Sequence, residues 1–362
     1  MYDIVLCFIT SFLLTYFAIP SIINIAAVKK LVDVPDERRS HEVPTPSLGG
    51  IGIFGGLLFS IILWTPFALI GDLQYILCSA IIIFLIGAKD DILPTSAMKK
   101  MLGQLFAAGI LVFKANVMIT SLYGIFGIYE LPYWIAAIFS LFIILVIINS
   151  FNLIDGINGL AASLGVLVTF LLGIWFWAVA HTELSLVAFA MTGALVAFLK
   201  YNLTPARIFM GDTGSLLVGL IVSILVIKFI EIHRISPDSI YAVKSAPAIA
   251  IALIIYPLFD TLRVFTMRII NKKSPFSPDR RHLHHGLLDL GLSHMQATFI
   301  LIVFTIEILS IALFLQNIGS FYLILVILGL SMGFAYLIRL MVANRQRLLS
   351  GTDGVKISAQ HF

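Results

Sequence analysis

The chain is a series of long apolar runs separated by short polar segments. A helix needs roughly 20 apolar residues to cross about 30 Å of hydrocarbon. Eleven runs approach that length, at 4–27, 48–70, 73–88, 100–119, 133–150, 160–180, 184–201, 213–230, 246–267, 296–315 and 320–341. The pattern therefore predicts an all-α, polytopic membrane protein of about 11 transmembrane helices.

Composition supports lipid as the solvent for most of the chain. It is 60% hydrophobic and 12% charged, with a mean hydropathy of +1.05, whereas soluble domains are about 25% charged. The net charge of +4, with no basic stripe outside the loops, argues against a nucleic-acid partner. Cys7 and Cys78 lie in apolar runs, so we expect no disulfide framework or cysteine metal site. The first run lacks a basic leader and a small-residue cleavage site, which predicts a retained helix rather than a signal peptide.

The distribution of positive charge predicts the orientation. Of the 23 lysines and arginines, 18 fall in one alternating set of segments, when those from Arg339 onward are counted with the C-terminal tail, and four in the other, while Arg263 lies near the end of the ninth run. Cytoplasmic segments are enriched in these residues, so we expect an outside N-terminus, a cytoplasmic C-terminus and five cytoplasmic loops. These are loop A (28–47), loop B (88–100), loop C (149–159), loop D (200–212) and loop E (268–295). We expect one membrane domain over 1–345 and a cytoplasmic tail at 346–362.

Loops A and B each allow two interpretations. Loop A holds His41 among basic residues, before prolines and the pair Gly49 and Gly50, which permits close backbone approach. It is either part of a ligand site or a basic loop touching anionic lipid. Loop B holds the adjacent carboxylates Asp90 and Asp91, which either share a cation or proton or form a solvated helix end.

Loops C and D carry amides and carboxylates next to apolar helices. Asn152, Asp155 and Asn158 are spaced by three, so one helical turn would place them on one face. The alternative is an interfacial turn with glycine caps. In loop D, Asp212 is either a site residue or a helix N-cap, and the flanking glycines and Phe209 favour a ligand site.

Loop E is the longest and holds Arg280 and three histidines, His282, His284 and His285. Arginine suits bidentate capture of phosphate, and histidine can bind a metal, transfer a proton or hydrogen-bond a ligand. Zinc is a weaker interpretation because no cysteine accompanies the histidines, and a simple cationic surface loop is the alternative. Taken together, the five loops bring carboxylates, amides, arginines and histidines to one membrane face. This combination suits Mg²⁺-assisted phosphoryl transfer.

These motifs resemble the polyprenyl-phosphate N-acetylhexosamine-1-phosphate transferase family over residues 30 to 345. The shared motifs, in the family's order, are Arg-Ser-His at 39–41 with Thr-Pro-Ser-Leu-Gly-Gly at 45–50, Asp-Asp at 90–91, Asn-Leu-Ile-Asp-Gly-Ile-Asn-Gly-Leu at 152–160, Phe-Met-Gly-Asp-Thr-Gly-Ser at 209–215 and His-Leu-His-His at 282–285. The resemblance implies transfer of a sugar 1-phosphate from a UDP-sugar to a polyprenyl phosphate with release of UMP. Mg²⁺ is the implied cofactor, with Mn²⁺ as an alternative.

The resemblance also implies residue roles. Asp212 resembles the Mg²⁺ ligand, with Asn152 as a second ligand. Asp90, Asp91 and Asp155 match essential carboxylates. Phe209 resembles the ring that stacks on uracil, near Asn202 and Asn158. His41, Arg268, Arg280, His282, His284 and His285 would face pyrophosphate and sugar. Many bacterial members carry aspartate where this chain has Asn158, and an amide can still read uracil but cannot act as a base.

The segment Pro278-Asp279-Arg280 before the histidines resembles the bacterial branch that uses UDP-GlcNAc and undecaprenyl phosphate to begin O-antigen, enterobacterial common antigen or teichoic acid synthesis. The expected location is the bacterial inner membrane with a cytoplasmic active site, and a second copy of the chain is a candidate partner. The alternatives are another UDP-N-acetylhexosamine, UDP-MurNAc-pentapeptide, a secondary transporter or a passive scaffold. Transporters tend to show paired halves with midplane polar sites, which this sequence lacks.

Overall fold

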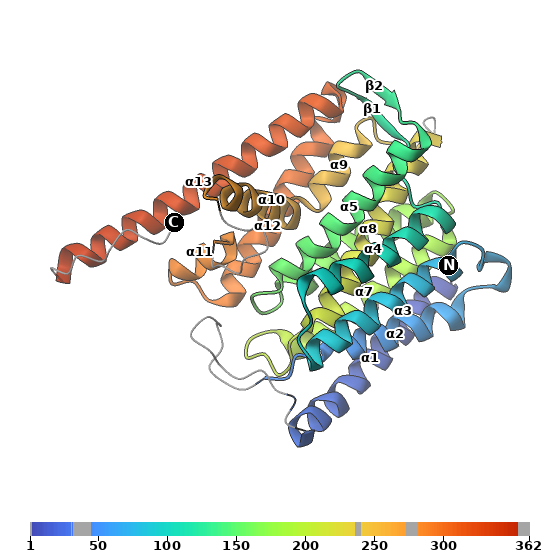
Figure 1. The fold of residues 1–362 in the computed structure, drawn as a ribbon, viewed down its shortest axis with the longest axis horizontal. Helices are drawn as coiled ribbons and strands as arrows, with labels where there is room; N and C mark the ends of the chain where they lie inside the picture. Colours follow the sequence, from blue (N-terminus) through green and yellow to red (C-terminus); the bar gives the residue numbers. More distant parts are fainter. Residues whose placement is uncertain (1, 30, 32–44, 236–239, 273–280, 354–362) are drawn as a thin grey trace.

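The computed structural model describes the whole chain except residues 1, 30, 32–44, 236–239, 273–280 and 354–362. Helices make up nearly all of it (Figure 1). In chain order the elements are α1 (Tyr2–Lys29), α2 (Gly49–Trp64), η1 (Phe67–Leu69), α3 (Leu73–Ile92), α4 (Ala97–Lys114), β1 (Ser121–Ile125), β2 (Ile128–Glu130), α5 (Tyr133–Ile154), α6 (Leu160–Ala178), α7 (Thr182–Asn202), α8 (Gly211–Ile235), α9 (Ala246–Leu253), α10 (Ile255–Ile270), α11 (Leu283–Asp289), α12 (His294–Phe314), η2 (Gln316–Ile318) and α13 (Ser320–Asp353).

The fold is an all-α polytopic membrane protein, as predicted. Among the described residues, seven helices are long and apolar enough to cross a membrane, or eight if the bent pair α9 and α10 counts as one span. Each of the eleven predicted runs contains a helix. The 16 residues of α2 extend only about 24 Å, which excludes α2 by length, and α3 and α4 are also absent from these candidate spans.

The ninth predicted run is not one continuous helix. It breaks at Ile254, and α9 and α10 meet at 81°. Pro257 has no N–H to donate to the carbonyl of Leu253, and its ring would clash with that carbonyl in a straight helix. The proline therefore falls in the first turn of α10, where it is tolerated, and the chain turns before it.

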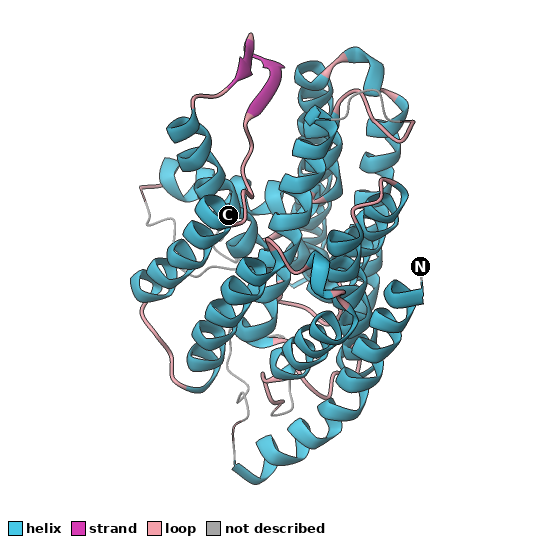
Figure 2. Cartoon of the chain, turned by 90° about the vertical axis from the view of Figure 1, so that its right-hand side faces the viewer, coloured by secondary structure: helices cyan, strands magenta, loops and turns pink. Residues whose placement is uncertain are grey.

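Two further features were not predicted. A hairpin of β1 and β2, antiparallel and closed by a turn at Gly124 and Gly127, projects from one end of the bundle (Figure 2). Helix α13 continues to Asp353, beyond the predicted end of its span at 341, and projects past the other helices (Figure 1). The first part of the predicted tail is therefore helical.

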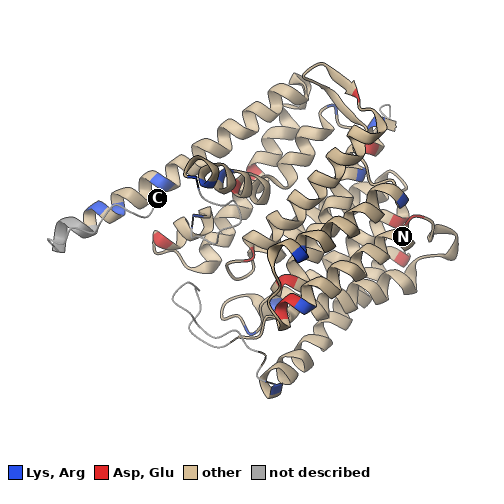
Figure 3. Ribbon diagram, viewed as in Figure 1, with Lys and Arg blue, Asp and Glu red and all other residues tan. Residues whose placement is uncertain are grey.

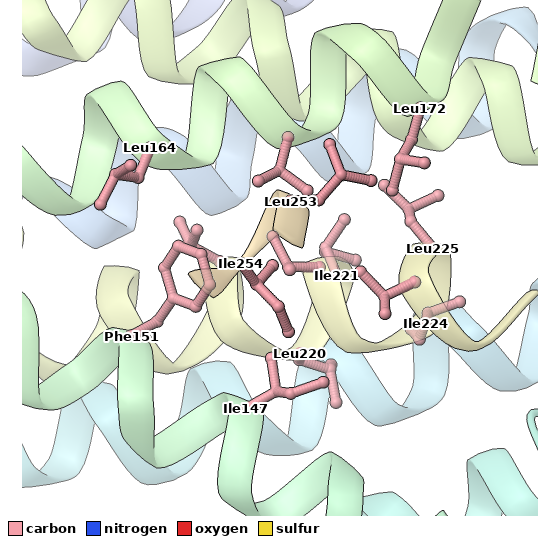
Figure 4. Close-up of a cluster of buried hydrophobic side chains, with 14 of the residues drawn as sticks. Ile147, Phe151, Leu164, Leu172, Leu220, Ile221, Ile224, Leu225, Leu253 and Ile254 are labelled. Atoms are coloured by element: carbon pink, nitrogen blue, oxygen red, sulfur yellow. The ribbon is translucent and has the colours of Figure 1, made fainter. Parts of the chain in front are cut away.

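Helix α8 forms the centre of the bundle. In its most apolar stretch 94% of the residues are buried, against α2, α3, α5, α6, α7 and α9. Its neighbours approach closely because small residues line the contacts. A Cβ added to Gly219 would lie 2.6 Å from the Cα of Ile148 on α5. Figure 4 shows the apolar core around α8, where side chains of α5, α6 and the α9–α10 break meet it.

Charged side chains gather toward the two ends of the helices (Figure 3). The apolar middle faces other helices or lipid, where an ionised side chain is costly. A dense group lies where the end of α3 and the beginning of α4 meet the beginning of α8. This group is the first part of the candidate site.

Candidate active site

The beginning of α8 is capped by a side chain from another helix. Asp91, in the last turn of α3, accepts hydrogen bonds from the backbone N–H groups of Asp212 at 2.7 Å and Thr213 at 3.0 Å, and from the Thr213 hydroxyl. Gly87, one turn earlier on α3, permits this approach, because a Cβ there would lie 2.4 Å from the Cα of Thr213. Asp91 thus satisfies free helix donors and places a negative charge at the positive end of the helix dipole.

Asp212 is the second residue of α8, so it is not the N-cap that the sequence also allowed. Its carboxylate is shared between an ammonium and an amide. Lys100, in the first turn of α4, contacts one oxygen of Asp212 and lies 3.3 Å from Oδ2 of Asp90. Asn152, near the end of α5, donates from Nδ2 to the other oxygen of Asp212 at 2.7 Å.

Asp90 points away from its neighbour Asp91. Its Oδ1 accepts from the backbone N–H of Thr95 at 2.7 Å and from the Thr95 hydroxyl, while its Oδ2 faces Lys100. The adjacent carboxylates therefore do not share one cation. Asp90 belongs to the charged cluster with Lys100 and Asp212, and Asp91 holds the helix start.

Loop C is only partly helical. Helix α5 ends at Ile154 and Asp155 is its C-cap, so Asn158 lies outside the helix and the expectation that 152, 155 and 158 share one helical face is wrong. Gly156 follows the C-cap, and Gly159 adopts a positive φ of 78°, which allows the chain to leave the helix here. Burial, together with the negative charges of Asp212 and Asp91, raises the pKa of Asp155 well above its usual range. Asp155 is therefore close enough to Asp212 and Asp91 to interact with them electrostatically.

Asn202 and Asn158 connect loops C and D. Asn202 is buried, accepts from the Gly159 backbone N–H at 2.8 Å and donates to the Ile208 carbonyl at 2.9 Å. Asn158 donates from its amide to the Thr204 hydroxyl at 3.1 Å. Both asparagines therefore form hydrogen bonds that connect loop C to loop D.

Phe209 is held at the junction of loops A and D. Its backbone N–H donates to the Pro46 carbonyl at 2.8 Å, and its carbonyl accepts from the Gly49 N–H at 2.9 Å. Its ring is half-buried. A Cβ added to Gly50 would lie 2.2 Å from the backbone nitrogen of Gly214, which confirms the predicted close backbone approach at this glycine pair.

Loop E reaches the site through its histidines. His284 is buried, its Nδ1 lies 3.0 Å from the Tyr256 hydroxyl, and its Nε2 would lie 2.7 Å from a Cβ added to Gly156 of loop C. Burial, followed by the charges of neighbouring histidines, lowers the pKa of His284 well below its usual range. The His284 ring stacks near-parallel on that of His282 at 5.5 Å and lies 4.3 Å from that of His285. Arg268, buried at the end of α10, stacks against Phe265, and His41 and Arg280 lie outside the described residues.

Two charged residues at the site were not predicted. Lys100 was counted only as a cytoplasmic charge, although it follows the acidic pair in the same loop. Asp260 is fully buried on α10 and bonds His282. The sequence could have indicated Asp260, because it is a carboxylate within the apolar run 246–267 and such residues are functional candidates by default.

The donor set fits a hard divalent cation. Asp90 and Asp212 already surround an ammonium, and Asn152 adds an amide next to Asp212. Within the described residues, no three carboxylates, histidines or cysteines group as a complete metal cage. Mg²⁺ commonly binds with one or two carboxylates and completes its shell with water and substrate phosphate, so two carboxylates suffice.

Fold and site together define a polytopic membrane protein with an ionic site at one end of its helices. Residues 73–230 match the model of glycosyl transferase family 4. The chain is 34% identical to a probable undecaprenyl-phosphate N-acetylglucosaminyl 1-phosphate transferase of Bacillus subtilis, over 86% of each chain. It is 30% identical to the undecaprenyl-phosphate alpha-N-acetylglucosaminyl 1-phosphate transferase of Escherichia coli O157:H7, over 85% of this chain and 81% of that one. It is also 30% identical to the decaprenyl-phosphate N-acetylglucosaminephosphotransferase of Mycobacterium tuberculosis, over 83% and 79%.

The chain therefore belongs to glycosyl transferase family 4, among the polyprenyl-phosphate N-acetylglucosamine-1-phosphate transferases. This confirms the family expected from the five motifs.

Proposed function

We propose that the protein transfers N-acetylglucosamine 1-phosphate from UDP-GlcNAc to undecaprenyl phosphate, releases UMP, and so begins synthesis of a cell-envelope polysaccharide. The observation that carries the proposal is the cluster of Asp212, Asp90 and Lys100 at the start of α8, joined by Asn152. Alternating charges at a helix start suit a diphosphate and its counter-cation. The names of the relatives supply the sugar and the lipid.

In the proposed reaction, an oxygen of the lipid phosphate attacks the β-phosphorus of the UDP-sugar. A new phosphorus–oxygen bond forms, the bond to the UMP oxygen breaks, and UMP leaves with the bonding pair. Lys100, which contacts Asp212 and Asp90 in this structure, would neutralise phosphoryl oxygens of the substrates if these carboxylates held Mg²⁺. Mg²⁺, held by Asp212 with Asn152 and Asp90 beside it, would supply charge neutralisation when bound.

An apolar cavity offers a place for a short part of the lipid chain. It has a volume of about 170 Å³ and is lined by residues of α5, α8, α9, α10, β1 and α13, including Ile147, and by Ile254 at the break between α9 and α10. Ile147 precedes Asn152 by five residues on α5, or about 8 Å. The cavity thus lies within about two helical turns of the carboxylate cluster along α5, and we propose that the part of the lipid chain nearest the headgroup lies there.

We further propose eleven crossings with the site on the cytoplasmic side. The bent segment supports this count because its ends lie at opposite ends of the bundle. Ser245, before α9, donates to the Gln316 carbonyl between α12 and α13, whereas Arg263 on α10 donates to the Arg281 carbonyl beside the site. The excess of lysine and arginine in loops A to E then places the site inside.

A membrane assay tests the transfer. Membranes containing the chain are incubated with radiolabelled UDP-GlcNAc, undecaprenyl phosphate and Mg²⁺, and label is followed into lipid. We expect lipid-linked label and release of UMP, near-complete loss in Asp212→Ala, and retention in Asp289→Ala, an exposed carboxylate on α11. Label entering lipid only from another UDP-sugar would overturn the choice of donor. Phosphosugar trapped on the protein without lipid acceptor would replace direct attack by a two-step route.

Cysteine labelling tests the orientation. In a background with Cys7 and Cys78 replaced by serine, a single cysteine is placed at the exposed Glu130 of β2 or at the exposed Asp289 of α11. An impermeant maleimide should label the first position in intact cells and the second only after permeabilisation. The reverse pattern would refute the proposed orientation.

A further inference from the structure

Helix α10 carries two side chains that hold the histidines of loop E. Tyr256 and Asp260 are four residues apart and so share one face of the helix. Each contacts the Nδ1 atom of one histidine, Tyr256 at 3.0 Å from His284 and Asp260 at 2.9 Å from His282. The break at Ile254 turns this face toward loop E.

Asp260 is enclosed by hydrogen-bond donors. It is 0% exposed. Its Oδ1 accepts from the Leu283 backbone N–H at 3.1 Å and from Arg263 at 2.8 Å, and its Oδ2 faces His282. Arg263 also donates to the Arg281 carbonyl, so the loop backbone on both sides of His282 is tied to α10. The arginine balances the buried carboxylate, which therefore needs no proton from the histidine.

An ionised carboxylate only accepts hydrogen bonds. The hydrogen bond at 2.9 Å therefore requires the proton of His282 on Nδ1, which leaves Nε2 as the nitrogen that can meet a ligand. We propose that Asp260 is a positioning residue of the transferase, which fixes the orientation and the tautomer of His282 toward the substrate diphosphate. This inference rests on the proposed function and adds a residue that acts through His282.

The substitution Asp260→Asn separates this role from packing. The amide has nearly the same shape, and its oxygen can keep the bonds from Leu283 and Arg263. Its NH₂ group then faces Nδ1 of His282 as a donor and favours the ring with its proton on Nε2. A wrong tautomer reduces turnover without removing a side chain.

The first measurement is a double-mutant cycle on turnover with Asp260→Asn, His282→Ala and the pair. We expect kcat of Asp260→Asn to fall about 10- to 100-fold with little change in KM. The double variant should be no slower than His282→Ala alone, because Asp260 acts through His282. Asp260→Glu, which remains acceptor-only, should recover part of kcat, and Asp289→Asn serves as the matched control. Wild-type kcat in Asp260→Asn, or losses that multiply in the double variant, would overturn the inference.

The second measurement does not depend on activity. Histidine ¹⁵N spectra of detergent-solubilised protein, with His282→Gln used for assignment, report which ring nitrogen carries the proton. We expect an Nδ1-protonated His282 in the wild type and in Asp260→Glu, and an Nε2-protonated ring in Asp260→Asn. A tautomer that does not change would refute the positioning role. If the wild type shows the expected tautomer but transfers no sugar phosphate, the proposed function fails and the placement of His282 stands.

Discussion

Replacing Lys100 by methionine removes the ammonium that Asp90 and Asp212 share while keeping a similar length of side chain. At the 3.3 Å separation of Lys100 and Asp90, unit charges attract by about 5 kcal/mol at an effective dielectric of 20. Desolvation and water access reduce this gross value, because the three side chains are 15–27% exposed. The net loss should lie between those of exposed and buried pairs, at about 1–3 kcal/mol in metal-free buffer.

The two carboxylates left by Lys100→Met attract a divalent cation more strongly than the wild-type cluster does. Thermal unfolding in detergent is measured in EDTA and in excess Mg²⁺, with Lys99→Met, an exposed neighbour, as the control. In EDTA the midpoint of Lys100→Met should fall by about 2–6 °C. Added Mg²⁺ should raise it more than it raises the wild type, because Lys100 no longer competes for the site.

Two results would contradict this reasoning. An equal Mg²⁺ response in Lys100→Met and the wild type would mean that the ion binds elsewhere. A midpoint in EDTA equal to that of Lys99→Met would mean that the shared ammonium does not stabilise the fold. These stability measurements are separate from activity. The turnover of Lys100→Met should be lost only if Lys100 also contacts the substrate phosphate.

Three further predictions concern the packing around the site. In Asp91→Asn an NH₂ group replaces one carboxylate oxygen, so the side chain can no longer accept all the hydrogen bonds that include those from the backbone N–H and the hydroxyl of Thr213. The free energy of unfolding in detergent should therefore fall by about 1–2 kcal/mol. An unchanged free energy of unfolding would refute the capping role. Gly50→Val forces a side chain onto the backbone of Gly214, so the folded yield by size-exclusion chromatography should collapse, and a normal elution profile would refute the close approach. His284 is neutral in the fold because burial lowers its pKa, whereas the unfolded chain binds a proton near pH 6.5. The free energy of unfolding should therefore fall as the pH drops below about 6.5, by up to about 1.4 kcal/mol per pH unit. His284→Gln should reduce this pH dependence. An equally steep dependence in the variant would show that His284 is not its source.

Much of the fold could be predicted from hydropathy because lipid accepts few alternatives to a long apolar helix. The convergence of loops B, C and D followed from the same logic, since polar groups gather at helix ends. The break at Ile254 was hidden because Pro257 lies within an apolar run, and hydropathy does not distinguish a straight span from a bent one. The hairpin β1–β2 was hidden because its strands are short and outside any long run.

The partners within the site could not be predicted. Asp90 and Asp91 are adjacent in sequence, but the packing of α3 against α8 sends them to different partners. Lys100 meets Asp212 only because α4 folds back along α3, and that contact spans 112 residues of sequence. Asn202 is typical of a ligand residue by type, yet its amide bonds two backbone groups.

The burial of α8 has a consequence for biogenesis. A ribosome makes α1 to α7 before α8, so those seven helices enter the bilayer while the position at their centre still lacks its helix. Asp212 lies on α8, whereas its partners Asp91 and Lys100 lie on helices that are made earlier. The cluster of Asp212, Asp90 and Lys100 is therefore completed only when α8 is in place, before Asp260 and the histidines of loop E have been made, and a chain truncated before α8 would keep the Lys100–Asp90 pair but lack Asp212.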